Sequence, residues 1–189
     1  MASKQENLVI SAGLVRRLTR ENRSLGTKLA GYELRRMLKE LSNPTLFGLE
    51  LDFPGEIASD PMPLPSIEND PVAERLAPLN VPLGSIVWTE TVMDLVTLGI
   101  FIPNLPAEEL RLALRALMTA HASDPFARLF FMCENFHPIP FLGRYGFAYD
   151  YLGKTTLEEA ARRAQKRHGI SEVRSVQGSK ILWKASDDL

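Results

Sequence analysis

The residues best suited to chemistry lie together in one stretch of the chain, residues 133–150. Cys133, Glu134, His137 and Asp150 supply a thiol, two carboxylates and an imidazole. A thiol with a nearby imidazole is the pairing of a cysteine nucleophile with its base, and two carboxylates can divide acid and base work. These four residues are the catalytic candidates. Sequence gives no distances between them, so it leaves open whether the chain is an enzyme.

The same stretch is rich in groups that could hold a ligand. Nine of the fifteen aromatic residues fall between residues 126 and 153. Phe136, Phe141 and Tyr145 could stack on a sugar or a base, and Arg144 could bind an anionic group. The alternative interpretation is that these rings pack in the core. The same alternative applies to Cys133, because a lone cysteine after three apolar residues is most often a small buried hydrophobe.

No metal site and no cofactor are predicted. Glu134 and His137 have the spacing of one half of a di-iron motif, but a second such pair is missing. Pro138 and Pro140 also predict that residues 133–144 form a rigid, non-helical loop. Gly153-Lys154-Thr155 resembles the end of a phosphate-binding loop, yet Ala148 stands where that motif needs glycine.

Periodicity divides the chain into three parts of one domain, residues 1–189. Residues 1–43 predict a helical hairpin that turns at 24–26, and no heptad repeat appears long enough to predict a coiled coil. Residues 54–82 hold seven of the thirteen prolines and predict an irregular arm. Residues 84–189 predict an α/β core.

The expected fold is a single mixed sheet flanked by helices, with a doubly wound α/β arrangement favoured over α+β. Asn104 is expected to cap the helix at 105–122, and Thr156 to open the helix at 156–168 with a capping box. Residues 90–102 fit a helix as well as a strand at 98–102. Strands are expected near 46–53, 86–89, 127–133 and 145–151, with a terminal β-hairpin at 172–184.

Composition narrows the class of protein. The net charge is −1, yet residues 1–43 carry nine Lys/Arg against four Asp/Glu, whereas residues 44–80 carry one against seven. The arginines of the first part fit a solvated helix surface, so nucleic acid is not expected as a partner. The single cysteine and the charges that interrupt each apolar run predict a soluble, cytoplasmic protein without a membrane segment.

Two classes of function follow. The first is a non-catalytic binding or protein-interaction module that presents the aromatic loop 133–144 to another protein or to a second copy in a homodimer. The alternative is a small-molecule transferase or hydrolase with a pocket at Glu134, His137, Arg144 and Asp150. The first is favoured, because no complete set of nucleophile, base and orienting group appears in the sequence.

Overall fold

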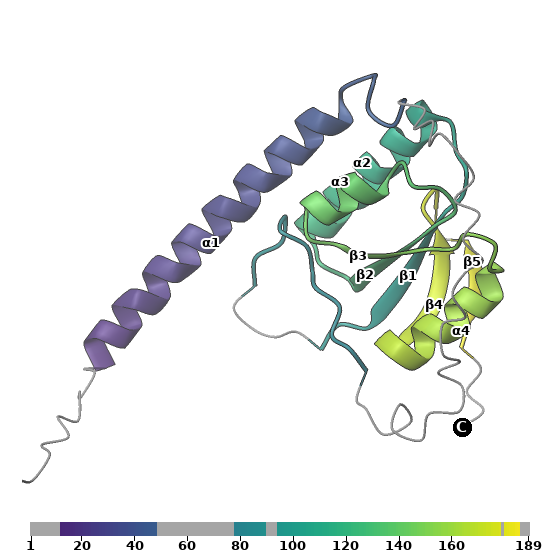
Figure 1. Ribbon diagram of the computed structural model, residues 1–189. Coiled ribbons are helices and arrows are strands. Elements are labelled where there is room, and N and C mark those ends of the chain that lie inside the picture. Colours follow the sequence, from purple (N-terminus) through teal and green to yellow (C-terminus); the bar gives the residue numbers. More distant parts are fainter. Residues whose placement is uncertain (1–11, 49–77, 90–93, 179, 186–189) are drawn as a thin grey trace, which may run out of the picture.

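The protein is described from a computed structural model, which covers residues 12–48, 78–89, 94–178 and 180–185 (Figure 1). Strands and helices alternate along most of the chain, which confirms the predicted α/β class. The elements are, in order, α1 (Ala12–Leu41), β1 (Thr97–Ile102), α2 (Ala107–Ser123), β2 (Arg128–Cys133), α3 (Ile139–Arg144), β3 (Ala148–Tyr151), α4 (Leu157–His168), β4 (Ile170–Ser175) and β5 (Ile181–Lys184).

One five-stranded sheet forms the centre, in the order β3-β2-β1-β4-β5. The first four of these strands are parallel, and β5 pairs antiparallel with β4. The sheet is therefore mixed, and the predicted terminal β-hairpin is confirmed. The strand order reverses beside β1, so that the carboxyl ends of β1 and β4 lie at the topological switch point of the sheet.

The sheet carries a core on each face, as a doubly wound arrangement requires. Leu98, Ile100 and Ile102 of β1 pack on the side of α2 and α3, together with alternate residues of β2. Phe130 and Met132 of β2 point the other way and pack on the side of α4. Figure 1 shows α2 and α3 on one face of the sheet and α4 on the other.

Two predicted strands are wrong where the structure describes them. In the segment 46–53, residues 44–47 form a turn, because the Asn43 side chain accepts a hydrogen bond from the backbone N–H of Thr45 at 3.1 Å. Residues 49–53 lie outside the described residues. In the segment 86–89, no residue is part of a strand. The Val87 N–H donates to Gly84 O, and the N–H of the preceding Ser85 donates to Tyr145 O at 2.8 Å.

The ambiguous stretch 90–102 is a strand at its end. Residues 90–93 lie outside the described residues, and β1 begins at Thr97. Because β1 is hydrogen-bonded to β2 on one side and β4 on the other, it is the central strand of the sheet. Such a strand is buried on both faces and therefore lacks the alternation that would separate it from a helix.

The predicted N-terminal helical hairpin is wrong. α1 is one helix of 30 residues and passes through the expected turn at 24–26. A glycine inside a helix costs only about 1 kcal/mol relative to alanine and does not by itself end the helix. Gly26 instead serves packing, because a Cβ atom there would lie 2.2 Å from Cδ2 of Trp88.

Residues 133–144 were predicted to form a non-helical loop, but the two prolines of this segment lie at the start of a helix, α3. Pro138 is the N-cap of α3 and Pro140 lies in its first turn. Proline is tolerated there because the first backbone N–H groups of a helix have no intrahelical acceptor. The predicted helix at 156–168 is confirmed, with the Thr156–Glu159 capping box at the start of α4.

The proline-rich arm 54–82 is described only from residue 78. Val81 is buried in the core on the α4 side, and the Leu79 N–H donates to Arg167 O at 2.8 Å. The end of the arm is thus held against α4. None of the helices in the described ranges is both long enough and apolar enough to span a bilayer.

Candidate functional site

Glu134 joins two loops at the carboxyl edge of the sheet. Its side chain accepts a hydrogen bond from the Asn104 backbone N–H at 2.8 Å, and the Asn135 side-chain amide donates to Asn104 Oδ1 at 3.1 Å. Asn104 was expected to cap α2, but the N-cap is Pro106, with no side-chain cap bond. The Glu134 carboxylate therefore connects the ends of β1 and β2, which is a structural role.

His137 and Asp150 have other surroundings. The His137 backbone N–H donates to Asn135 Oδ1 at 3.2 Å. Asp150 pairs in register with Met132, whose side chain packs on the α4 side of the sheet. Neighbouring residues of paired strands point to the same face, so Asp150 lies on the face opposite to Cys133. No hydrogen bond in the described part of the chain joins Glu134, His137 and Asp150 to one another.

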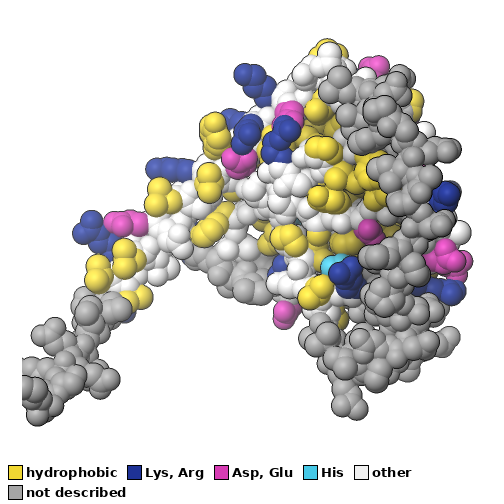
Figure 2. All heavy atoms as spheres, in the orientation of Figure 1, with side chains coloured by type: hydrophobic (Ala, Val, Ile, Leu, Met, Phe, Trp, Pro, Cys, Tyr) yellow, Lys and Arg dark blue, Asp and Glu magenta, His cyan; other side chains and the backbone are white. Residues whose placement is uncertain are grey.

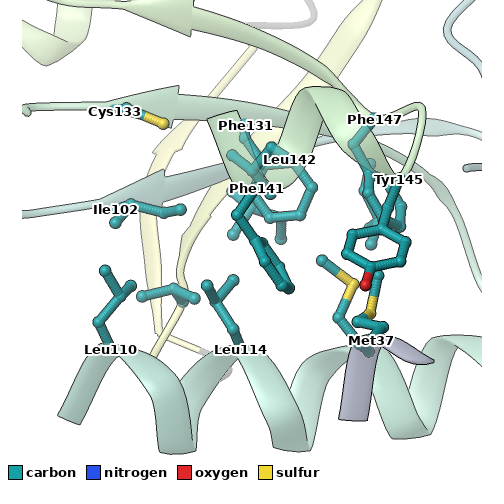
Figure 3. Close-up of a cluster of buried hydrophobic side chains, with 14 of the residues drawn as sticks. Met37, Ile102, Leu110, Leu114, Phe131, Cys133, Phe141, Leu142, Tyr145 and Phe147 are labelled. Carbon is teal, nitrogen blue, oxygen red and sulfur yellow. The ribbon is translucent and has the colours of Figure 1, made fainter. Parts of the chain in front are cut away.

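Cys133 is a core residue. Its side chain is fully buried and packs on the α2 and α3 side of the sheet, where Figure 3 shows it beside Ile102. Burial, with a further contribution from the charge of Asp150, raises the pKa of the Cys133 thiol to about 12. Only the thiolate is a nucleophile, so this thiol is unreactive near neutral pH.

Two of the three candidate stacking rings are buried. Phe141 is 2% exposed and Tyr145 is 0% exposed, and Figure 3 shows both in the cluster between α3 and the helices below it. Phe136 is 44% exposed and stacks on Tyr151, with 3.8 Å between the ring centroids. Phe136 therefore lies at the surface, whereas Phe141 of α3 and Tyr145, which follows α3, lie in the core.

Arg144 binds within the chain, to a residue that the sequence did not single out. Arg144 forms an ion pair with Glu40 of α1, and the Tyr145 hydroxyl donates to the second oxygen of the same carboxylate at 2.7 Å. Burial raises the pKa of Tyr145, and the bond to Glu40 raises it further. Sequence carries no signal for this contact, because 104 residues separate Arg144 from Glu40.

The structure does not assemble the candidates into one chemical centre. Among the described residues, no three His, Cys, Asp or Glu side chains come together as a metal site. A cavity of about 270 Å³ lies between α2, β1 and the turn that joins β4 to β5. Its described lining is mostly apolar, including Leu98, Ile100 and Leu117, and it contains none of the candidate residues.

A different surface stands out along α1. The carboxyl-terminal half of this helix packs against the rest of the protein through Gly26, Ala30, Met37 and Leu41, all buried. Residues 13–25 are all exposed, and Figure 1 shows that this half projects away from the sheet. Within the described ranges, α1 is therefore packed against the body at its carboxyl-terminal end and exposed over residues 13–25.

The uncovered side of α1 is apolar along one stripe. We call this stripe the α1 seam and define it as Val15, Leu18, Asn22, Leu25, Leu29 and Tyr32. Its five apolar members are between 48% and 65% exposed, and Asn22 is exposed as well. Figure 2 shows hydrophobic side chains recurring along α1 as it leaves the body.

This stripe would not exist in the predicted helical hairpin. A turn at 24–26 would place Leu18 and Leu29 on separate helices, whereas one continuous helix aligns them. The signal that could have revealed it is the absence of proline from residues 12–41, together with apolar residues at alternating spacings of three and four.

Comparisons with known proteins add no relative. No family model matches the chain, and neither the curated protein sequences nor the solved structures contain a protein that matches it.

Proposed function

We propose that this chain is a non-catalytic protein-interaction module and that its binding surface is the α1 seam. The observation that carries the proposal is the exposure of five large apolar side chains on one stripe of a helix that projects from the body. Contiguous exposed apolar surface of this kind is uncommon on monomeric proteins and is typical of interaction sites. The interaction class is the one that the sequence favours, with the surface moved from the loop 133–144 to α1.

The energetics of an isolated helix support this choice. Helices shorter than about 12–15 residues are marginal in water without tertiary contacts. Residues 13–25 have no buried side chain, so packing against the described part of the chain contributes little to the stability of the first half of α1. Burying the seam against a partner would supply that stabilisation.

The catalytic alternative has less support. Glu134 is bound to Asn104, Arg144 is paired with Glu40, and Asp150 lies on the other face of the sheet from Cys133. An acid/base mechanism needs its groups within hydrogen-bond reach of one reacting atom. We therefore do not propose a transferase or a hydrolase centred on these residues.

The proposal is tested with a photoreactive benzophenone residue at position 25, introduced into the full-length chain and irradiated both in cells and after purification. Leu112 of α2 is the matched control site, because it is 62% exposed and Leu25 is 65% exposed. We expect position 25 to form an adduct with another polypeptide chain and position 112 to form none. Equal labelling at both positions, or a link only to residues of the same chain, would contradict the proposal.

A further inference from the structure

Resting on the proposed function, we infer that the partner of the α1 seam is a second copy of this chain, and that two copies pair in parallel and in register. The seam residues alternate in steps of three and four, which is the spacing of a coiled coil. In heptad notation, Val15, Asn22 and Leu29 occupy the a positions, and Leu18, Leu25 and Tyr32 occupy the d positions. The seam spans about 26 Å of helix at 1.5 Å per residue.

Asn22 identifies both the partner and the orientation. In a parallel, in-register pair the two Asn22 side chains meet at the same level, and each amide can donate to and accept from the other. An antiparallel pair would instead place Asn22 opposite an apolar d residue. An unrelated apolar groove would likewise bury the amide without a partner, which is unfavourable. A second copy is the occupant that satisfies this residue with groups already present in the chain.

The charges that flank the seam fit the same arrangement. Lys28 occupies a g position and Glu33 the e position five residues later, which are the positions that meet across a parallel pair. A parallel dimer therefore brings Lys28 of each copy toward Glu33 of the other, whose side chain is 17% exposed and lies 3.7 Å from Arg36 of its own helix. Arg16, Arg20 and Arg23 fall at outward b and f positions, where charge stays in water.

The placement of the body leaves room for the second helix. Gly26, Ala30 and Met37 mark the side of α1 that faces the body. At 100° per residue, that side lies about a quarter of a turn around the helix from the seam. A two-fold axis along the paired helices therefore puts the two bodies on opposite sides of the pair, so that they do not compete for the seam.

Sedimentation equilibrium of the full-length chain tests the inference. We expect the wild type to dissociate reversibly between twice the 21.1 kDa chain mass and the chain mass itself as it is diluted. L25E should sediment as a monomer across the same range, and the matched variant L112E should remain dimeric. Because both substituted leucines are exposed, both variants should fold. Far-ultraviolet circular dichroism and urea unfolding of each variant check that the body is folded.

N22L gives an independent measurement. A polar residue at an a position weakens association while it specifies the dimer. We therefore expect N22L to lower the dissociation constant at least tenfold or to add species larger than a dimer. A dissociation constant unchanged by N22L would place Asn22 outside the interface and overturn the inference, as would a dimer that survives L25E.

The failure of this inference can be told from the failure of the proposed function. A wild type that stays monomeric at several hundred micromolar, with position 25 photocrosslinked to a different protein, refutes the second copy and retains the interaction surface. A monomer with no adduct at position 25 refutes both.

Discussion

The Tyr145 hydroxyl donates a hydrogen bond to the Glu40 carboxylate at 2.7 Å and so fastens the anchored end of α1 to the segment that follows α3. Hydrogen bonds to charged groups contribute about 1.5–3 kcal/mol. Y145F should lower the free energy of unfolding by an amount of that order, measured by urea denaturation. Y149F is the control, because Tyr149 is 42% exposed, and it should change stability by less than about 0.5 kcal/mol. Equal effects of the two substitutions would mean that the bond to Glu40 does not stabilise the fold.

Two glycines of α1 should respond to alanine in opposite directions. A Cβ atom at position 31 meets no atom within 4 Å, so G31A should gain the helix propensity of alanine, up to about 1 kcal/mol. At position 26 the Cβ atom would overlap the Trp88 indole, so G26A should lose more stability than the propensity returns. Urea unfolding measures both, and a red shift of the tryptophan emission should accompany G26A as the indole is displaced. A stabilising G26A would show that α1 does not pack on Trp88.

The Tyr145–Glu40 and Gly26–Trp88 contacts illustrate which features of the fold could be predicted from the sequence and which could not. The capping box at Thr156 and the helix predicted at 105–122 depend on residues close together in the chain; the first is confirmed, and the second forms as Ala107–Ser123 without the expected Asn104 cap. Gly26, in the middle of α1, packs against Trp88, which lies 62 positions further along the chain. Local composition at 24–26 favoured a turn, whereas the glycine at position 26 serves a contact with a residue too distant in the chain to be predicted.

The candidate residues between 133 and 150 do not come together in the structure, for a related reason. The residue types between 133 and 150 are suitable for chemistry. However, the directions of their side chains are set by the register of the sheet and by interaction partners elsewhere in the chain. Register places Asp150 on the face opposite to Cys133, and Glu40 binds Arg144. Neither the register of a parallel sheet nor an ion pair across 104 residues can be read from composition or spacing.

His121 should make the fold sensitive to acid. The ring is buried and its Nε2 lies 3.1 Å from Leu83 O, where it donates to the carbonyl as the neutral tautomer. Burial lowers the pKa of His121 below its usual 6.5, although the bond to Leu83 acts in the other direction. The unfolded chain therefore binds more protons than the folded chain once the pH falls below about 6.5. The stability from a neutral His121 is complete above that pH and is lost as the pH falls further.

The measurement is urea unfolding between pH 8 and pH 5, comparing the wild type with H121Q. We expect the free energy of unfolding of the wild type to decline below about pH 6.5 and that of H121Q to decline less. His168, whose pKa burial also lowers, contributes a slope of the same sign, so H121Q/H168Q should have the flattest profile. Identical slopes in all three proteins would contradict the placement of these rings.

Cys133 should be inert in the folded protein. With a thiol that is 0% exposed and has a pKa of about 12, the native chain should not react with Ellman's reagent at pH 8, and one thiol should appear in guanidinium chloride. This thiol is the only one in the chain, so the signal is unambiguous. Rapid native labelling would restore Cys133 as a candidate nucleophile.

Disulfide formation at the centre of the α1 seam tests the central claim most directly. N22C places two thiols opposite each other in a parallel, in-register dimer, and R20C places them at the outward f position. Both are equilibrated in a glutathione redox buffer and analysed by intact mass without reduction. Cys133 is buried and is expected to remain reduced in both. We predict a covalent dimer as the main species of N22C and a monomer as the main species of R20C. If N22C remains as monomeric as R20C, the chain does not pair in parallel through α1.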